Sequence, residues 1–128
     1  MKTLGIDYGE KRIGLAISDE TQTFARELVI LSPKEFWGQL DQLISDHEIS
    51  KIVVGWPLNM SGEMTEKTKE VERFKIKVES KTGLPVEIID ERLSSVMAGK
   101  MPGGGKNVDS LAAQILLQNW LDKNKKIY

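Results

Sequence analysis

The sequence of 128 residues contains no cysteine. This absence excludes disulfide bonds, thiolate nucleophiles and metal sites built from cysteine. Histidine is nearly absent too, because His47 is the one histidine in the chain. A single histidine cannot build a histidine-rich zinc site, and we interpret His47 as a surface residue near a helix end. Any metal site must therefore use oxygen ligands, which favours Mg²⁺ or Mn²⁺.

An excess of charge of one sign is also lacking. Eighteen Lys and Arg residues against 19 Asp and Glu residues give a formal net charge of −1. Nucleic-acid binding would therefore require a local basic patch or metal ions. We find no apolar run long enough to span a bilayer and no signal peptide, so we expect a cytoplasmic protein with no membrane partner. The length favours one domain over residues 1–128.

Residues 1–19 predict a β-hairpin with a carboxylate at the end of its first strand. The first apolar run ends at Asp7, a turn containing Gly9 follows, and a basic tip precedes a second apolar run over 13–17. A carboxylate among apolar residues is unfavourable unless it faces a cation or hydrogen-bond donors. Asp7 is therefore either a ligand-facing residue at a sheet edge or a cap of the turn, and the hairpin alone leaves both open.

Further elements follow from apolar periodicity and from Gly, Pro and Ser at segment ends. The predicted strands span 25–31, 51–55 and 86–89, and the predicted helices span 33–46, 65–81, 93–100 and 108–121, the last one capped by Asn107. Helical connections return the chain in the same direction, so we expect an α/β fold. Its mixed five-stranded sheet has three antiparallel strands, then two parallel strands, and is flanked by helices. In the last helix the expected core-facing stripe comprises Val108, Leu111, Ala112, Ile115 and Leu116.

Acidic residues stand where two of the parallel strands end. Asp7 ends the first strand, and Asp90 and Glu91 follow the last one. Because the carboxyl ends of parallel strands meet at one edge of a sheet, these residues should converge although they are distant in sequence. Asp90 and Glu91 compete for one place, since neighbours on extended backbone point to opposite faces.

Asp109 adds a third carboxylate, in the first turn of the last helix, where the helix dipole stabilises negative charge. Three neighbouring carboxylates repel one another unless cations lie between them. Two Mg²⁺ ions about 4 Å apart would remove that repulsion and could clamp a phosphodiester. Simpler interpretations exist for single residues: Asp109 as a helix-terminal charge, and Glu91 as an ion-pair partner of Arg92 or Lys100. Their joint occurrence favours the metal site.

Four segments of the chain resemble the YqgF/RuvX family of small bacterial proteins. They are GIDYGEKRIGLAISD, VVGWPLNMSGEMTEKT, DERLSS and VDSLAAQILLQNWL. The resemblance covers nearly the whole chain, and four ordered motifs are more specific than any one of them. It implies an RNase H-like fold and a nuclease function, either in resolving Holliday junctions or in maturing the 5′ end of small-subunit ribosomal RNA.

The resemblance also implies the site residues. The catalytic and metal-binding acids of the family fall on Asp7, Glu91 and Asp109, which selects Glu91 over Asp90. Two Mg²⁺ or Mn²⁺ ions are expected, with Asp7 bridging them. The residues expected to bind the substrate are Lys11, Arg12, Asn59, Ser61, Thr65, Arg92, Ser94, Ser95 and Lys106.

The sequence departs from the family pattern in two places. Members usually carry a longer basic segment before the last acidic motif, whereas residues 100–106 contain three glycines and only two lysines. Fewer cations should weaken nucleic-acid binding, and the segment is either a mobile flap or a shortened loop of little importance. Trp56 replaces a smaller apolar residue and either stacks on a base or shields the end of the sheet.

Three functions are compatible with these features. The leading hypothesis is a metal-dependent endonuclease that acts on a ribosomal RNA precursor, with the small ribosomal subunit as a partner. The second is a resolvase of branched DNA, which would require a dimer with two sites. The third is a non-catalytic module that binds RNA or the ribosome. We expect a monomer or a weak homodimer. An actin-like phosphotransferase is excluded by length, because it needs two such domains.

Overall fold

The computed structural model describes residues 1–90 and 108–124. In chain order its elements are β1 (Lys2–Asp7), β2 (Ile13–Ser18), β3 (Ala25–Leu31), α1 (Pro33–Asp46), β4 (Ile49–Trp56), α2 (Glu66–Thr82), β5 (Val86–Asp90) and α4 (Val108–Lys123). The helix expected over 93–100 and the glycine-rich segment over 100–106 lie outside the described residues. Within the described parts of the chain, no helix combines the length and the apolar character needed to cross a membrane.

The sheet has the strand order β3-β2-β1-β4-β5. Strand β1 is central and pairs antiparallel with β2 and parallel with β4. Strand β2 pairs antiparallel with β3, and β4 pairs parallel with β5. The predicted mixed sheet, with three antiparallel strands and two further parallel strands, is confirmed.

Local sequence signals set the ends of the helices. Helix α1 begins with a capping box, in which the Ser32 side chain accepts from the Glu35 amide and Glu35 accepts from the Ser32 amide. It ends at His47, which is its C-cap and lies near a helix end as expected. Helix α2 ends at Gly83 in the left-handed conformation (φ 69°), which glycine adopts without strain.

Two strands extend beyond their predicted ranges. Strand β4 spans Ile49–Trp56 instead of 51–55, and β5 continues to Asp90. The prediction was too short because it followed the apolar runs only. Pairing with a neighbouring strand also orders polar residues, as at the Trp56–Asp90 pair.

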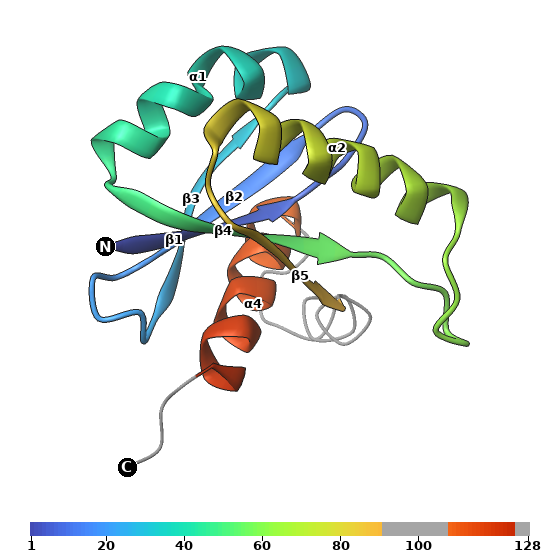
Figure 1. Ribbon diagram of the computed structural model, residues 1–128. Coiled ribbons are helices and arrows are strands. Elements are labelled where there is room, and N and C mark those ends of the chain that lie inside the picture. The colour runs from blue at the N-terminus through green and yellow to red at the C-terminus, as the bar shows by residue number, and fades with distance from the viewer. Residues whose placement is uncertain (91–107, 125–128) are drawn as a thin grey trace.

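Helices cover both faces of the sheet (Figure 1), with α1 and α2 on one face and α4 on the other. Leu4 and Ile6 of β1 belong to the core cluster shared with α1 and α2. A second core cluster joins α4 to Val53 of β4 and Ile89 of β5. Side chains alternate between the two faces along a strand, so β1 contributes to both layers and is buried between them.

Helix α4 is buried over a wider arc than predicted. Among its described side chains, which begin at Leu111 and so leave out Val108 of the predicted stripe, the buried ones are those of Ala113, Ile115, Leu116, Leu117, Trp120 and Leu121. The predicted stripe was partly wrong, because Ala113 and Leu117 were not in it and Leu111 and Ala112 are only half-buried. Helix α4 contacts three strands, β1, β2 and β3, so more of its surface is buried than a single apolar stripe.

Gly5 allows α4 to lie against the central strand. A Cβ atom at this position would lie 2.8 Å from Leu117 Cβ, closer than such atoms approach. We expect Gly5→Ala to lower the free energy of unfolding by about 1–3 kcal/mol, because the helix or the strand must shift. Urea unfolding would measure this change.

Gly38→Ala is the matched control for this prediction. Gly38 lies inside α1, and a Cβ atom there would meet nothing within 4 Å. Its replacement should raise the free energy of unfolding by about 0.5–1 kcal/mol, because alanine loses less backbone entropy in a helix. Equal effects of the two substitutions would show that α4 does not require glycine at position 5.

Candidate active site

The carboxyl ends of β1, β4 and β5 lie at one edge of the sheet, as predicted from the sequence. Ile6 pairs with Val54, and Gly55 pairs with Ile89. Asp7, one residue beyond Ile6, is therefore level with these last two residues. Neighbouring strands lie about 4.8 Å apart, so the Cα atoms of Asp7 and Ile89 lie about 10 Å apart across β4.

Asp7 lies on the α4 side of the sheet. Gly5, two residues earlier, approaches Leu117 of α4, and side chains two residues apart on a strand share a face. Asp7 is half-buried, since the strand and its neighbours cover part of its surface. A half-buried carboxylate at the end of a central strand is a common position for a ligand-binding group in an α/β sheet.

The first turn of α4 lies at the same end of the sheet as Asp7. Along α4, Leu117 lies next to Gly5 of β1. Three residues later, the Trp120 ring lies below Lys51, whose Nζ is 5.1 Å from the centre of that ring. Lys51 pairs with Thr3 and is near the amino end of β4. The carboxyl end of α4 thus points to the amino ends of the strands, and its amino end points to their carboxyl ends.

The predicted acidic triad is described only in part. Asp109 is the second residue of α4, but its side chain lies outside the described part of the structure. Glu91 lies outside it entirely, as do four of the residues expected to bind substrate: Arg92, Ser94, Ser95 and Lys106. Among the described residues, no three Asp, Glu or His side chains gather closely enough to hold a metal ion. The acidic triad therefore stays a prediction.

The basic tip of the hairpin is exposed beside this edge. Lys11 and Arg12 are exposed in the connection between β1 and β2. The connection is tight, because a Cβ atom on Gly9 would lie 2.5 Å from the Arg12 carbonyl oxygen. Glycine at position 9 therefore keeps the two cations close to the end of β1 that carries Asp7.

The loop over 57–65, which follows β4, is organised around Asn59. The Asn59 side-chain oxygen accepts from the backbone amides of Ser61 at 3.0 Å and of Glu63 at 2.9 Å. An isolated antiparallel bridge joins Leu58 to Met64 and closes the loop. Asn59 and Ser61, both expected to bind substrate, are exposed at its tip. The structure thus gives Asn59 a role in shaping the loop.

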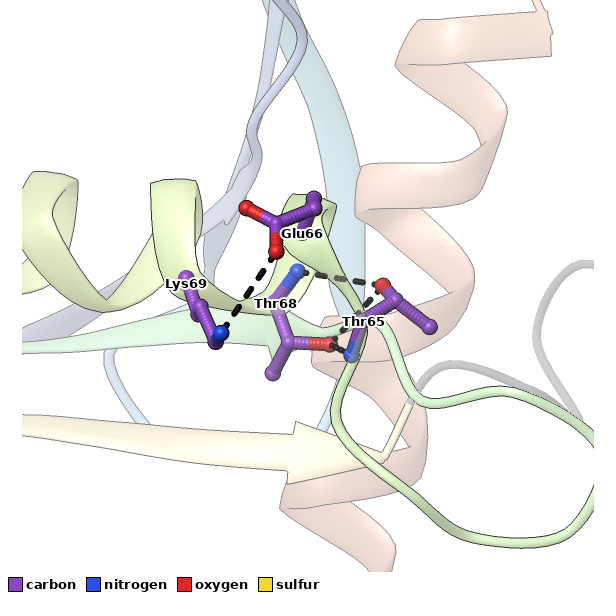
Figure 2. Close-up of polar contacts among 4 residues, drawn as sticks. All are labelled: Thr65, Glu66, Thr68 and Lys69. Atoms are coloured by element: carbon purple, nitrogen blue, oxygen red, sulfur yellow. Dashed lines mark hydrogen bonds and ion pairs between the residues drawn. The ribbon is translucent and has the colours of Figure 1, made fainter.

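A pair of threonines connects this loop to α2 (Figure 2). Thr65 is the N-cap of α2, and its amide donates to Thr68 Oγ1 at 2.9 Å while its hydroxyl accepts from the Thr68 amide at 3.3 Å. The Thr68 hydroxyl also donates to the Pro57 carbonyl oxygen. Thr68 is fully buried. One hydroxyl therefore joins both ends of the loop.

Thr68 was not among the residues predicted for the site. The T-x-x-T spacing at the start of α2 is a signal for reciprocal capping, but the bond to Pro57 depends on how the loop folds back. Trp56 is half-buried at the end of β4 and pairs with Asp90. Both interpretations of Trp56, stacking and shielding, are compatible with this position.

Comparisons with known proteins agree with the predicted family. The RuvX family model, described as Holliday junction resolvase, matches residues 1–123. A protein of Maridesulfovibrio salexigens is 39% identical over 94% of this chain and 98% of its own. A protein of Geobacillus thermodenitrificans is 36% identical over 98% of this chain and 100% of its own. Both relatives carry the name "Putative pre-16S rRNA nuclease".

A solved structure shows the same fold. RuvC of T. thermophilus, in complex with a Holliday junction substrate, aligns with a TM-score of 0.59 at 14% sequence identity and covers 99% of both chains. At this identity the likeness concerns the fold. It confirms the RNase H-like fold that the family resemblance implied.

The buried hydroxyl of Thr68 provides a test of how the loop is held. We expect Thr68→Val to lower the free energy of unfolding by about 1–3 kcal/mol, because the Pro57 carbonyl and the Thr65 amide lose their partner. Amide hydrogen exchange over 57–65 should also become faster.

Thr68→Ser is the matched control, since it keeps the hydroxyl and removes only a methyl group. It should leave the exchange rates of the loop close to those of the wild-type protein. If Thr68→Val and Thr68→Ser change loop exchange equally, the hydroxyl does not hold the loop.

Proposed function

Because the chain belongs to the RuvX family, we propose that it is a nuclease that acts on a precursor of small-subunit ribosomal RNA. The support is a match over nearly the full length of relatives named as pre-16S rRNA nucleases. The position of Asp7 agrees with this function, because it is half-buried at the carboxyl end of the central strand. That position suits a group that contacts the scissile phosphate through a cation.

The proposed metal ligands are Asp7, Glu91 and Asp109, which would hold two Mg²⁺ or Mn²⁺ ions. The donor set fits such ions, because a chain without cysteine and with one distant histidine offers oxygen ligands. When bound, divalent cations stabilise the charge that develops on the phosphate and lower the pKa of a coordinated water. A carboxylate at position 109 would also benefit from the dipole of α4.

The protein's own cations are proposed to position the substrate. Lys11 and Arg12 are exposed beside the end of β1, where they can pair with phosphates on either side of the cleaved bond. The formal net charge is −1, so these local cations matter more than the charge of the whole chain. The loop over 57–65 would also border the substrate, with Ser61 at its exposed tip and Thr65 at the start of α2 in contact with it.

Resolution of branched DNA is the second candidate function. It is favoured by the description of the family model and by the fold shared with a RuvC that was solved on a Holliday junction. The same carboxylates would serve in both reactions. Cutting two strands of one junction needs two sites, and therefore a dimer. A non-catalytic binding module would keep the fold without metal-dependent cleavage.

Replacement of Asp7 tests the proposed chemistry. We expect Asp7→Asn to slow cleavage of a precursor RNA by about 10²–10³-fold or more, since a ligand worth several kcal/mol in the transition state is lost. Single-turnover cleavage of a labelled RNA that spans the 5′ end of 16S rRNA would measure the rate.

Asp41→Asn serves as the control for this variant, because Asp41 is an exposed carboxylate on α1. It should cleave at the wild-type rate. Unfolding curves of both variants would show that the fold is retained. Wild-type cleavage by Asp7→Asn would refute the assigned role of this residue.

Metal removal and a choice of substrates separate the candidate functions. We expect wild-type protein with Mg²⁺ to cut the precursor RNA, and excess chelator to stop cleavage until Mg²⁺ is restored. A four-way DNA junction incubated in parallel should be cut much more slowly. Faster cutting of the junction by a dimer would favour the resolvase. Absence of any cleavage that Asp7 and Mg²⁺ control would favour the binding module.

A further inference from the structure

A groove runs along α2 on the face of the sheet opposite to α4. It consists of two adjoining hollows, of about 450 and 490 Å³, which share Glu10 and Glu70. The hollow nearer the amino end of α2 is lined by Glu10, Lys11, Glu66, Lys67 and Glu70. The other is lined by Tyr8, Glu10, Pro33, Trp37, Glu70, Arg73, Phe74 and Lys77. Lys77 follows Glu66 by eleven residues along α2, so the groove is about 16 Å long.

The far hollow has an aromatic floor. The ring centres of Tyr8 and Phe74 are 4.6 Å apart, and those of Trp37 and Phe74 are 5.5 Å apart. Phe74 is buried, whereas Tyr8 and Trp37 are half-buried and line the hollow. Lys77 Nζ lies over the Trp37 ring, 4.3 Å from its centre. Lys81 Nζ also lies over this ring, 5.7 Å from its centre, so an incoming planar group would have to displace flexible lysine side chains from the ring.

The walls of the groove carry four cationic and three acidic side chains. The cations are Lys11, Lys67, Arg73 and Lys77, and the acids are Glu10, Glu66 and Glu70. A nearly balanced wall is a poor site for a simple polyanion. It suits a ligand with both phosphates and hydrogen-bond donors, because carboxylates accept from the amino groups of bases and cations pair with phosphates.

The aromatic hollow begins immediately beside the candidate catalytic residue. Tyr8 follows Asp7 in the chain, and adjacent strand residues point to opposite faces. Asp7 lies on the α4 side, while Tyr8 packs on Phe74 of α2. Burial and then the carboxylates of Glu70 and Glu10 raise the pKa of the Tyr8 phenol, whereas Arg73 lowers it. Tyr8 and Lys11 both line the groove, so its wall includes residues close to Asp7 in the chain.

We propose that this groove binds a single-stranded segment of the nucleic-acid substrate that flanks the cleaved bond, with one base stacked on Trp37. The proposal rests on the proposed nuclease function and names the class of substrate that the site accepts. Arg73 and Lys77 would contact the backbone of this segment, and Glu10 and Glu70 would accept from the amino groups of its bases.

The need for an unpaired base follows from the proposed stacking on Trp37. A base can stack on a protein ring only after it has left the stack of a helix. A fully paired duplex keeps its bases inside and presents only its backbone to Trp37. The groove thus favours RNA with an unpaired flank over a fully paired four-way junction.

Binding measured without cleavage tests this proposal. In chelator, we expect Trp37→Leu to weaken binding of a single-stranded RNA oligonucleotide by about tenfold, the loss typical of one stacked base. Binding of the same RNA annealed to its complement should be unchanged. Leucine keeps an apolar contact with Phe74, and unfolding curves would check the fold of the variant.

Two controls on exposed residues match the variants of the groove. Phe24→Ala removes an aromatic ring that is 69% exposed in the turn after β2, and it should not change RNA binding.

Lys77→Ala tests the proposed phosphate contact. It should reduce the slope of log K against log salt by about 0.7 for the single strand, as expected for one lost phosphate contact. Lys123→Ala, at the exposed end of α4, should leave the slope unchanged.

Wild-type protein gives a test that needs no variant. An oligonucleotide carrying 4-thiouridine in its unpaired flank should crosslink to the peptide with Trp37 or to the one with Tyr8. Unchanged affinity of Trp37→Leu together with crosslinks elsewhere would overturn the proposal. A free nucleoside monophosphate that binds as tightly as the oligonucleotide would also overturn it, because the groove would then be a small-molecule site.

The outcomes separate this proposal from the nuclease function. If the wild-type protein cuts RNA in a manner that depends on Asp7 but Trp37→Leu binds normally, the groove proposal fails and the nuclease stands. If Trp37 is needed for binding but no cleavage depends on Asp7, the groove stands as part of a binding module.

Discussion

The burial of β1 between two layers of helices is the constraint on which the rest of the structure depends. Leu4 and Ile6 pack toward α1 and α2, while Gly5 admits Leu117 of α4 on the other face. A strand covered on both faces is held in register by its two neighbours, and its carboxyl end cannot slide relative to those of β4 and β5. This arrangement also fixes the position of the candidate site, because Asp7 is the last residue of β1.

The alternation of side chains along β1 divides the edge of the sheet into two environments. Asp7 is on the α4 side, with the amino end of α4, whereas Tyr8 is on the side of α1 and α2 and forms part of an aromatic hollow. In the two proposals, the cleaved phosphate lies beside Asp7, and the flanking strand lies in the groove beside Tyr8. One residue of backbone separates the two, so cleavage and strand binding would be coupled by a short, rigid connection.

Hydrogen bonds within the chain hold the loop that follows β4 at this edge of the sheet. Asn59 shapes the loop after β4 by accepting from two backbone amides, and Thr68 joins the loop to α2 through Pro57. Such supporting contacts keep exposed groups in place without themselves touching a ligand. The relatives of this chain are named as nucleases, and Asp7, Glu91 and Asp109 are the residues proposed to bind the metal ions.

The amino-acid sequence alone determined the order of strands and helices, the mixed sheet and the position of Asp7 at the end of the first strand. These features follow from local signals, since periodicity, capping residues and glycine turns act within a few residues. Only the tertiary structure decided the wide burial of α4, the Thr68–Pro57 contact and the groove that Tyr8, Trp37 and Lys77 line. These features join segments that are distant in sequence, so they depend on how whole elements dock, which no local pattern encodes.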